Sequence, residues 1–553
     1  MNYVWRCLFL FLATSGSLTD GLLRNTTYGP VDGEETTVGE RSMMSFKGIP
    51  YAAPPIGPLR FKCSVPQFLR PEVFGPALED EDCLYLNVLA PKEPSTEFPN
   101  GYPVMFWIHG GSLLMGSAPD FAAADGVLSN LCSRDVIVVT INYRLGLFGF
   151  LSTGDEAAPG NWGLWDQRMA LKWTKENIAN FGGDPNKITA IGQSSGSTSV
   201  GALAISPAAM DLMHQIIQMS GSILSYWALQ SRAYVLETTT TLAKEMNCPT
   251  SSSQEMIDCL RYKPAKPLVN MAHVEYKTLI KNPLEPLSFS RHGRPVLDGD
   301  FFPNSITELT KSATPKPMIN GVTEMEFVET IEDILEEEPD KIIQERRVTE
   351  ELLYKSLDGL LEFPAIMYAN GAIERALVNT MVAKCYITPH LNDQTRLMYG
   401  LAQAAGDMSM VDSIVEDIKM KLESGWPTYV YIFDHISPTA QHKILKGSAH
   451  GSELGYLFAQ KWTDFTDPTE QAVRDNLAEL FTNFVKYGNP TPEPVGGAEW
   501  PQLSSDELNQ YLNISSTLKL MSHFKPTLQK CRKMIPDALQ WFRDSTADGF
   551  PQN

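Results

Sequence analysis

A short glycine-flanked segment, Gly192-Gln193-Ser194-Ser195-Gly196, holds the residues of this sequence best suited to covalent chemistry. Where a Gly-x-Ser-x-Gly segment joins a strand to a helix, its tight turn points the central hydroxyl outward at the helix N-terminus. An apolar run, 188–191, precedes this segment, and residues 197–205 can continue as a helix. The pattern predicts that Ser194 is a nucleophile, with Ser195 as the rival hydroxyl that the spacing disfavours.

A serine hydroxyl becomes nucleophilic when a histidine takes its proton and a carboxylate orients that histidine. With this type of turn, the acid and then the histidine follow the serine along the chain. His450 is the favoured base, because it lies in a glycine- and serine-containing loop, 447–453, after the apolar run 429–433. His435 and His442 are the alternatives.

The carboxylate is expected after an earlier apolar stretch, 317–320, which Gly321 follows. Glu326 and Glu324 both come after this stretch, only two residues apart. Spacing alone does not choose between them.

Acyl chemistry also needs backbone N–H groups that stabilise the negative oxygen formed when a carbonyl is attacked. The segment His109-Gly110-Gly111-Ser112 directly follows the apolar run 104–108, where such a loop is expected. We expect the N–H groups of Gly111, Ser112 and Ser195 to be the donors of this oxyanion hole.

These residues must be brought together by a sheet whose strands end close to one another. Continuous apolar runs rich in β-branched residues are typical of strands covered on both faces. Such runs occur at 104–108, 136–141, 188–191, 216–219, 318–319 and 429–433. Helical patterns such as 166–180 lie between them, which predicts an α/β fold with a central, mostly parallel sheet flanked by helices. Charged, helix-forming sequence from about 329 to 424 predicts a helical subdomain within a single domain, 18–553.

Composition and charge exclude some classes of partner. Of the 553 residues, 43% are hydrophobic and 20% charged, which is ordinary for a globular protein. A formal net charge of −20 would repel phosphate backbones, so nucleic acid is not an expected partner. A small molecule that reaches Ser194 is the expected one.

The N-terminus has the features of an export signal. Arg6 precedes the apolar run 7–13, and small residues follow through Ser17. An apolar stretch of this length favours a cleaved signal peptide, 1–17, over a membrane span. No later stretch approaches the ~20 apolar residues that a spanning helix needs, so no transmembrane anchor is expected. We therefore expect a secreted protein, found outside the cell or in the lumen of the secretory pathway.

Cysteines and sequons fit an exported chain. Cys248 and Cys259 are close enough in sequence to form a disulfide in an oxidising compartment, and Cys63 and Cys83 are a second possible pair. The pairing of the remaining cysteines is open: Cys132, Cys385 and Cys531. Two sequons are candidate glycosylation sites: Asn25 and Asn513.

Longer motifs run in order along nearly the whole chain: Phe46-Lys47-Gly48-Ile49-Pro50-Tyr51-Ala52, Glu81-Asp82-Cys83-Leu84-Tyr85-Leu86-Asn87-Val88, Asn142-Tyr143-Arg144-Leu145-Gly146, 160–167, Phe181-Gly182-Gly183-Asp184-Pro185, Ser220-Gly221-Ser222, 295–299 and 447–453. Together they resemble the type-B carboxylesterase/cholinesterase family. The resemblance implies the α/β-hydrolase fold.

Carried over by matching position, the resemblance also implies a set of roles. Ser194 would be the nucleophile and His450 the base. Glu326 would be the acid in preference to Glu324, because the family's carboxylate lies five residues after the glycine that matches Gly321. The implied reaction is ester hydrolysis in two steps through an acyl-enzyme, with no metal and no organic cofactor. A disulfide between Cys248 and Cys259 would also match the family.

The chain departs from the family pattern at three places. Its elbow has Gln193 where the family commonly has Glu and Ser195 where it has Ala, and Ser112 stands at the third glycine of the oxyanion loop. A serine there is strained if the backbone needs a positive φ. The stretch 62–80 is short and lacks the tryptophan with which cholinesterases hold a quaternary ammonium.

A neutral carboxylic ester is therefore a better expected substrate than a choline ester. Phe289 is a candidate for shaping the acyl pocket, and packing in the core is an equally good interpretation of it. The sequence predicts a secreted serine carboxylic ester hydrolase. The alternative hypothesis is a catalytically weak or inactive family member that acts in binding or adhesion.

Overall fold

The structure is a computed structural model, and it describes residues 22–63, 80–268, 293–329, 372–390, 393–439, 445–460, 463, 465–504 and 508–547. Several sequence predictions fall outside these residues: the signal peptide 1–17, His442, Phe289, most of the stretch 62–80, and residues 330–371 of the expected helical subdomain.

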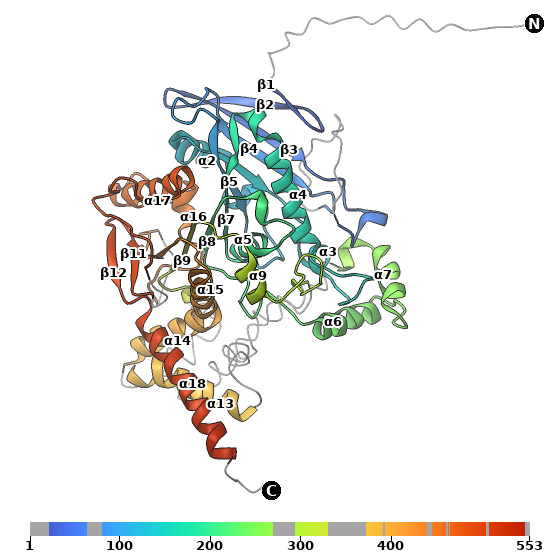
Figure 1. The fold of residues 1–553 in the computed structure, drawn as a ribbon, viewed down its shortest axis with the longest axis vertical. Coiled ribbons are helices and arrows are strands. Elements are labelled where there is room, and N and C mark those ends of the chain that lie inside the picture. Colours follow the sequence, from blue (N-terminus) through green and yellow to red (C-terminus); the bar gives the residue numbers. More distant parts are fainter. Residues whose placement is uncertain are drawn as a thin grey trace, which may run out of the picture.

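A single large sheet forms the centre of the described chain (Figure 1). Its twelve strands lie in the order β1-β2-β3-β4-β6-β5-β7-β8-β9-β10-β11-β12. The strands are β1 Leu22–Thr26, β2 Gly29–Val38, β3 Arg41–Pro50, β4 Tyr85–Pro91, β5 Tyr102–Ile108, β6 Ile137–Ile141, β7 Gly183–Gln193, β8 Gln215–Met219, β9 Met318–Thr323, β10 Thr428–Phe433, β11 Gln510–Ile514 and β12 Lys519–Ser522. Every neighbouring pair from β6 to β11 is parallel, whereas the pairs at both edges are antiparallel. The prediction of a mostly parallel central sheet is confirmed, and each apolar run that suggested it overlaps one of the strands β5 to β10.

The central strands are mainly apolar because both faces of the sheet are covered. Along β5, Val104, Phe106 and Ile108 pack into one hydrophobic cluster, while Met105 and Trp107 pack into another on the opposite face. The first cluster includes side chains of the helices α4 (Trp162–Asn177), α5 (Ser195–Ile205) and α15 (Asp412–Glu423). The second includes side chains of α2 (Ala124–Asn130), α16 (Leu454–Leu457) and α17 (Pro468–Tyr487). Burial on both faces explains why these strands do not alternate apolar with polar residues.

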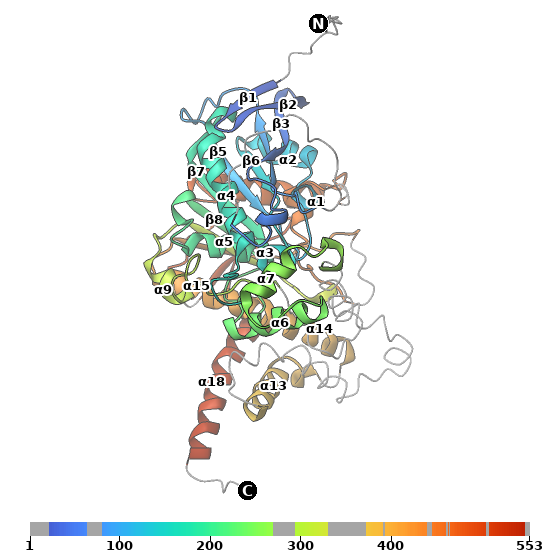
Figure 2. The same cartoon turned by 90° about the vertical axis from the view of Figure 1, so that its right-hand side faces the viewer.

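The helices that cover the sheet and extend from it are α1 Ala118–Phe121, α2 Ala124–Asn130, α3 Gly146–Phe150, α4 Trp162–Asn177, α5 Ser195–Ile205, α6 Arg232–Glu245, α7 Ser253–Arg261, α9 Ile306–Ser312, α13 Ala372–Tyr386, α14 Gln394–Gly406, α15 Asp412–Glu423, α16 Leu454–Leu457, α17 Pro468–Tyr487 and α18 Pro526–Ala547. Within the stretch 329–424, the described part consists mainly of α13, α14, a π-helical turn and α15. The C-terminal helix α18 packs against α13, so the last helix of the chain adjoins the described part of the stretch 329–424 (Figures 1 and 2). The sequence did not predict that contact.

A buried ion pair joins the segment after β6 to α4. The guanidinium of Arg144 contacts Asp166 through two hydrogen bonds of 2.7 Å, from Nε to Oδ2 and from Nη2 to Oδ1. Both side chains are almost fully buried, and Arg144 also donates to the carbonyl of Lys62. Breaking one partner of such a pair leaves an uncompensated buried charge, which costs about 3–5 kcal/mol. This contact gives a structural reason for the two motifs that contain Arg144 and Asp166.

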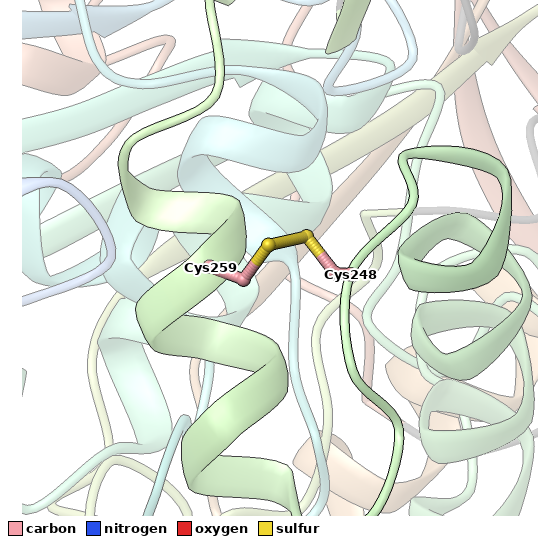
Figure 3. The surroundings of a disulfide bond; sticks show 2 residues. All are labelled: Cys248 and Cys259. Atoms are coloured by element: carbon pink, nitrogen blue, oxygen red, sulfur yellow. A yellow bond between two sulfur atoms is a disulfide. The ribbon is translucent and has the colours of Figure 1, made fainter.

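One disulfide is present among the described residues, between Cys248 and Cys259 (Figure 3). It ties the loop that follows α6 to α7 across a sequence separation of 11. The second possible pair is not formed, because Cys63 and Cys83 are free thiols here. Three buried cysteines are free as well: Cys132, Cys385 and Cys531. In the part of the chain described above, no helix is long and apolar enough to cross a membrane.

Candidate active site

The segment that holds Ser194 is a strained turn between β7 and α5. Strand β7 ends at Gln193, α5 begins at Ser195, and Ser194 between them has φ 58° and ψ −126°. A Cβ atom on Gly192 would lie 2.4 Å from the backbone of Gly196, and one on Gly196 would lie 2.1 Å from the carbonyl oxygen of Ile108. Both positions therefore require glycine. A non-glycine residue in such a conformation costs about 1–3 kcal/mol and is typical of functional sites.

The loop after β5 lies directly against this turn. A Cβ atom on Gly110 would be 3.0 Å from Cβ of Ser194. Gly111, Ser112 and Leu113 all have positive φ, of 103°, 58° and 60°. The sequence predicted that a serine at this third glycine position would be strained if its φ were positive. Ser112 has φ 58°, so it is strained.

Hydrogen bonds fix the loop in this shape. The N–H of Leu113 donates to Oγ of Ser195 at 3.0 Å, and Nη1 of Arg294 donates to the carbonyl of Ser112 at 3.1 Å. The N–H groups of Gly111, Ser112 and Ser195 donate to no protein acceptor within the described ranges. These three donors are therefore open to a ligand at the turn.

Glu326 and His450 meet at the carboxyl ends of the adjacent parallel strands β9 and β10. Nδ1 of His450 lies 2.5 Å from Oε2 of Glu326. The other carboxylate oxygen, Oε1, accepts hydrogen bonds from Oγ of Ser220 at 2.6 Å and from the N–H of Thr323 at 2.7 Å. Three donors thus hold the carboxylate in one orientation, and Ser220, which directly follows β8, is a positioning residue that the sequence predictions missed.

Charge in this pair is set by burial and by mutual attraction. Burial favours the neutral acid, but the charge of His450 and the hydrogen bonds from His450, Ser220 and Thr323 hold the pKa of Glu326 below its usual value of 4.5. Burial would lower the pKa of His450, yet the charge and hydrogen bond of Glu326 raise it above 6.5. His450 must be neutral to accept a proton, so a reaction that uses it is lost as the pH falls through this raised pKa.

A second carboxyl group lies close behind the pair. Glu453 is fully buried, and neither of its oxygens has a hydrogen-bond partner among the described residues. Burial, followed by the negative charge of Glu326, raises the pKa of Glu453 to about 8. Glu453 is therefore mainly neutral at pH 7 and adds little negative charge beside His450. Its place in the motif with His450 was the only sequence signal for it.

The other candidates lie elsewhere. His435 contacts Glu470 through Nε2 at 2.6 Å, in a cluster apart from Glu326. The carboxylate at Glu324 does not contact His450; its backbone pairs with Phe433 and with Nζ of Lys525. The hydroxyl of Ser195 is buried and holds Leu113. No group of three or more His, Cys, Asp or Glu side chains suited to a metal ion occurs in the described ranges.

Nε2 of His450 faces Gln193, which the sequence analysis identified only as a departure from the pattern of the similar family. The side-chain Nε2 of Gln193 lies 3.1 Å from it. The hydroxyl of Ser194 has no hydrogen bond to His450 or to any other residue that the structure describes. The turn thus brings Gln193, rather than Ser194, into direct contact with the imidazole.

A mostly parallel sheet with helices on both faces, a strained serine turn after β7 and a carboxylate–histidine pair after β9 and β10 together define the α/β-hydrolase fold. The model of the carboxylesterase family matches residues 20–74 and 63–532. The chain belongs to this family, and it is a carboxylic ester hydrolase.

Curated relatives are similar over most of their length. The chain is 33% identical to the precursor of a medium-chain fatty acyl-CoA hydrolase of Anas platyrhynchos, covering 90% of both chains. It is 31% identical to the esterase cest-33 of Caenorhabditis elegans, over 88% of this chain and 89% of the relative. It is 30% identical to an acylcarnitine hydrolase of Mus musculus, over 95% and 93%.

The strain at Ser112 can be tested by two substitutions. We expect Ser112→Gly to raise the free energy of unfolding by up to about 1 kcal/mol, because relief of the positive φ outweighs the larger entropy that glycine loses on folding. Ester turnover should stay within about threefold of wild type. In the matched variant Ser112→Val, a β-branched residue cannot hold this φ, so we expect turnover to fall at least about tenfold. Urea unfolding and ester turnover measure both effects, and a Ser112→Gly variant less stable than wild type would contradict the account.

Proposed function

We propose that this carboxylic ester hydrolase acts through an acyl-enzyme on Ser194, with His450 as general base and Glu326 as the acid that orients it. The observation that carries the proposal is the 2.5 Å contact between Glu326 and His450 next to the strained turn of Ser194. A carboxylate on Nδ1 fixes the tautomer whose Nε2 can accept a proton.

In the first step, Oγ of Ser194 attacks the carbonyl carbon of the ester while Nε2 of His450 takes the hydroxyl proton. The carbonyl oxygen becomes negative, and the N–H groups of Gly111, Ser112 and Ser195 stabilise it. The bond to the alcohol oxygen then breaks, and His450 gives the proton to the departing alcohol. This leaves the acyl group bound to Ser194.

In the second step, water attacks the acyl carbon as His450 takes one of its protons. Collapse of the second tetrahedral intermediate breaks the bond to Oγ of Ser194, which regains a proton from His450, and a carboxylic acid leaves. Glu326 stays ionised throughout, since its low pKa and three hydrogen bonds favour the carboxylate.

The substrate we propose is a neutral carboxylic ester. Gln193 supports this choice, because an amide stands beside the nucleophile where a carboxylate would attract a cationic substrate. The names of the relatives cover acyl-CoA and acylcarnitine, and the step common to these reactions is transfer of an acyl group to water. For this chain we therefore propose only the transfer of an acyl group to water.

The mechanism is tested by comparing the two adjacent serines. We expect Ser194→Ala to lower kcat for a short-chain nitrophenyl ester by at least about a thousandfold and to abolish labelling by an organophosphate. The matched variant Ser195→Ala removes the rival hydroxyl but keeps the main-chain N–H, so its turnover should stay within about tenfold of wild type. Folded wild-type protein that neither turns over esters nor takes the label would contradict the mechanism and favour a role in binding or adhesion.

We further propose that residues 1–17 are a signal peptide and that the mature chain is secreted and glycosylated. The Cys248–Cys259 disulfide supports an oxidising compartment. Asn25 is exposed on β1, whereas Asn513 is partly buried on β11 between β10 and β12, so Asn25 is expected to carry more glycan.

In peptide mapping of unreduced protein from the culture medium, the first residue should be Leu18 and the peptides of Cys248 and Cys259 should be linked. Protein retained in the cytosol with residues 1–17 intact would contradict this part of the proposal.

A further inference from the structure

We propose that Gln193 is a positioning residue whose amide N–H holds Nε2 of His450 in its neutral, accepting form and competes with Ser194 for it. The inference rests on the proposed function, because it assigns a role beside the proposed base. It concerns the resting enzyme, before substrate is bound.

When the ring of His450 is neutral, its hydrogen bond with Gln193 can have only one direction, with Gln193 as the donor. Oε2 of Glu326 lies 2.5 Å from Nδ1 of His450, so the ring proton belongs on Nδ1 and the lone pair on Nε2. The side-chain nitrogen of Gln193, 3.1 Å away, can only donate. It therefore occupies the same lone pair that must accept the proton of Ser194.

Two loops enclose the amide of Gln193, and the residue that each loop places next to the amide is a glycine. A Cβ atom on Gly110 would lie 3.0 Å from Oε1 of Gln193, and one on Gly451 would lie 3.2 Å from its Nε2. Gln193 as a whole residue is only 4% exposed. The oxyanion loop and the histidine loop thus enclose the amide between them, at a distance that suits contact with His450.

Protonation of His450 reverses the interaction. Two N–H groups would then face each other across 3.1 Å, so the amide has to turn its oxygen toward the ring or move away. The hydrogen bond is made only to the neutral form and therefore opposes protonation. The titratable groups that act on His450 are all acidic, namely Glu326 and Glu329 from the segment after β9 and Glu453 from its own loop, and Glu453 is mainly neutral at pH 7. A carboxylate at position 193 would add a further one directly at Nε2.

Two variants and a control separate this role from a structural one. Gln193→Glu places a negative charge at Nε2, and Gln193→Met keeps the length of the side chain but removes the donor. The control, Gln510→Glu, makes the same change of charge on the exposed first residue of β11. Because β11 runs parallel to β10, its first residue lies at the amino ends of the parallel strands, whereas the active site lies at their carboxyl ends. The measurements are the pH dependence of kcat/KM for a nitrophenyl ester and the rate at which an organophosphate labels Ser194.

For Gln193→Glu we expect the acid limb of kcat/KM to move up by at least about one pH unit, because His450 must then lose its proton beside another carboxylate. At a pH one unit below the wild-type midpoint, this lowers kcat/KM about tenfold relative to wild type. For Gln193→Met we expect Ser194 to be labelled about two- to tenfold faster at high pH, because the competing donor is gone. The profile of Gln510→Glu should superimpose on that of wild type. Thermal unfolding shows that each protein is folded, and Gln193→Met decides the question if the glutamate variant does not fold.

Superimposable pH profiles and equal labelling rates in folded Gln193 variants would overturn the inference while leaving the proposed mechanism intact. Wild-type protein that is not labelled at Ser194 would instead contradict the proposed function.

Discussion

The hydrogen bond between Glu326 and His450 is the contact that gives the site its chemistry, and it depends on two strands that are far apart in the sequence. Glu326 follows β9 and His450 follows β10, and parallel pairing of these strands brings their carboxyl ends to one edge of the sheet. Ser194 and Ser220 follow β7 and β8 at the same edge. The register of four neighbouring parallel strands thus determines which side chains can meet.

Burial makes the charge of each carboxyl group depend on its partners. Glu326 accepts three hydrogen bonds and stays ionised, whereas Glu453, equally buried and without a described partner, has a pKa of about 8. Two nearby carboxylates cannot both be ionised at low cost in a buried site, so one carries the charge and the other is neutral. An amide at position 193 fits this arrangement, since a third acid at this site would bind a proton or raise the pKa of His450 further.

The sequence predicted the strands and residues whose signal is local. Runs of mainly apolar residues mark β5 to β10, because strands covered on both faces have no solvent-exposed side, and the Gly-x-Ser-x-Gly segment marks the turn at Ser194. The edge strands gave weaker signals: β1 alternates between exposed and half-buried residues, and β12 is exposed throughout. Spacing alone could not separate Glu326 from Glu324, which the family resemblance and the contact with His450 distinguish.

Contacts between distant segments could not be predicted in this way. Gln193 and His450 are 257 residues apart, and the role of Ser220 depends on the parallel pairing of β8 with β9. The neutral state of Glu453 depends on its burial and on the nearby charge of Glu326, which is 127 residues away in the sequence. A sequence motif identified each of these segments, but only the packed structure shows what its side chains contact.

The most direct test of the mechanism is to identify the serine that carries the acyl group during turnover. Wild-type protein would be mixed with a nitrophenyl ester, quenched in acid within the first turnover, digested and mapped by mass spectrometry. The account predicts a burst of nitrophenol equal to the enzyme concentration, if deacylation is the slower step, and an acyl group on Ser194. Acylation of Ser195, or turnover with a burst but no acylated serine, would contradict it.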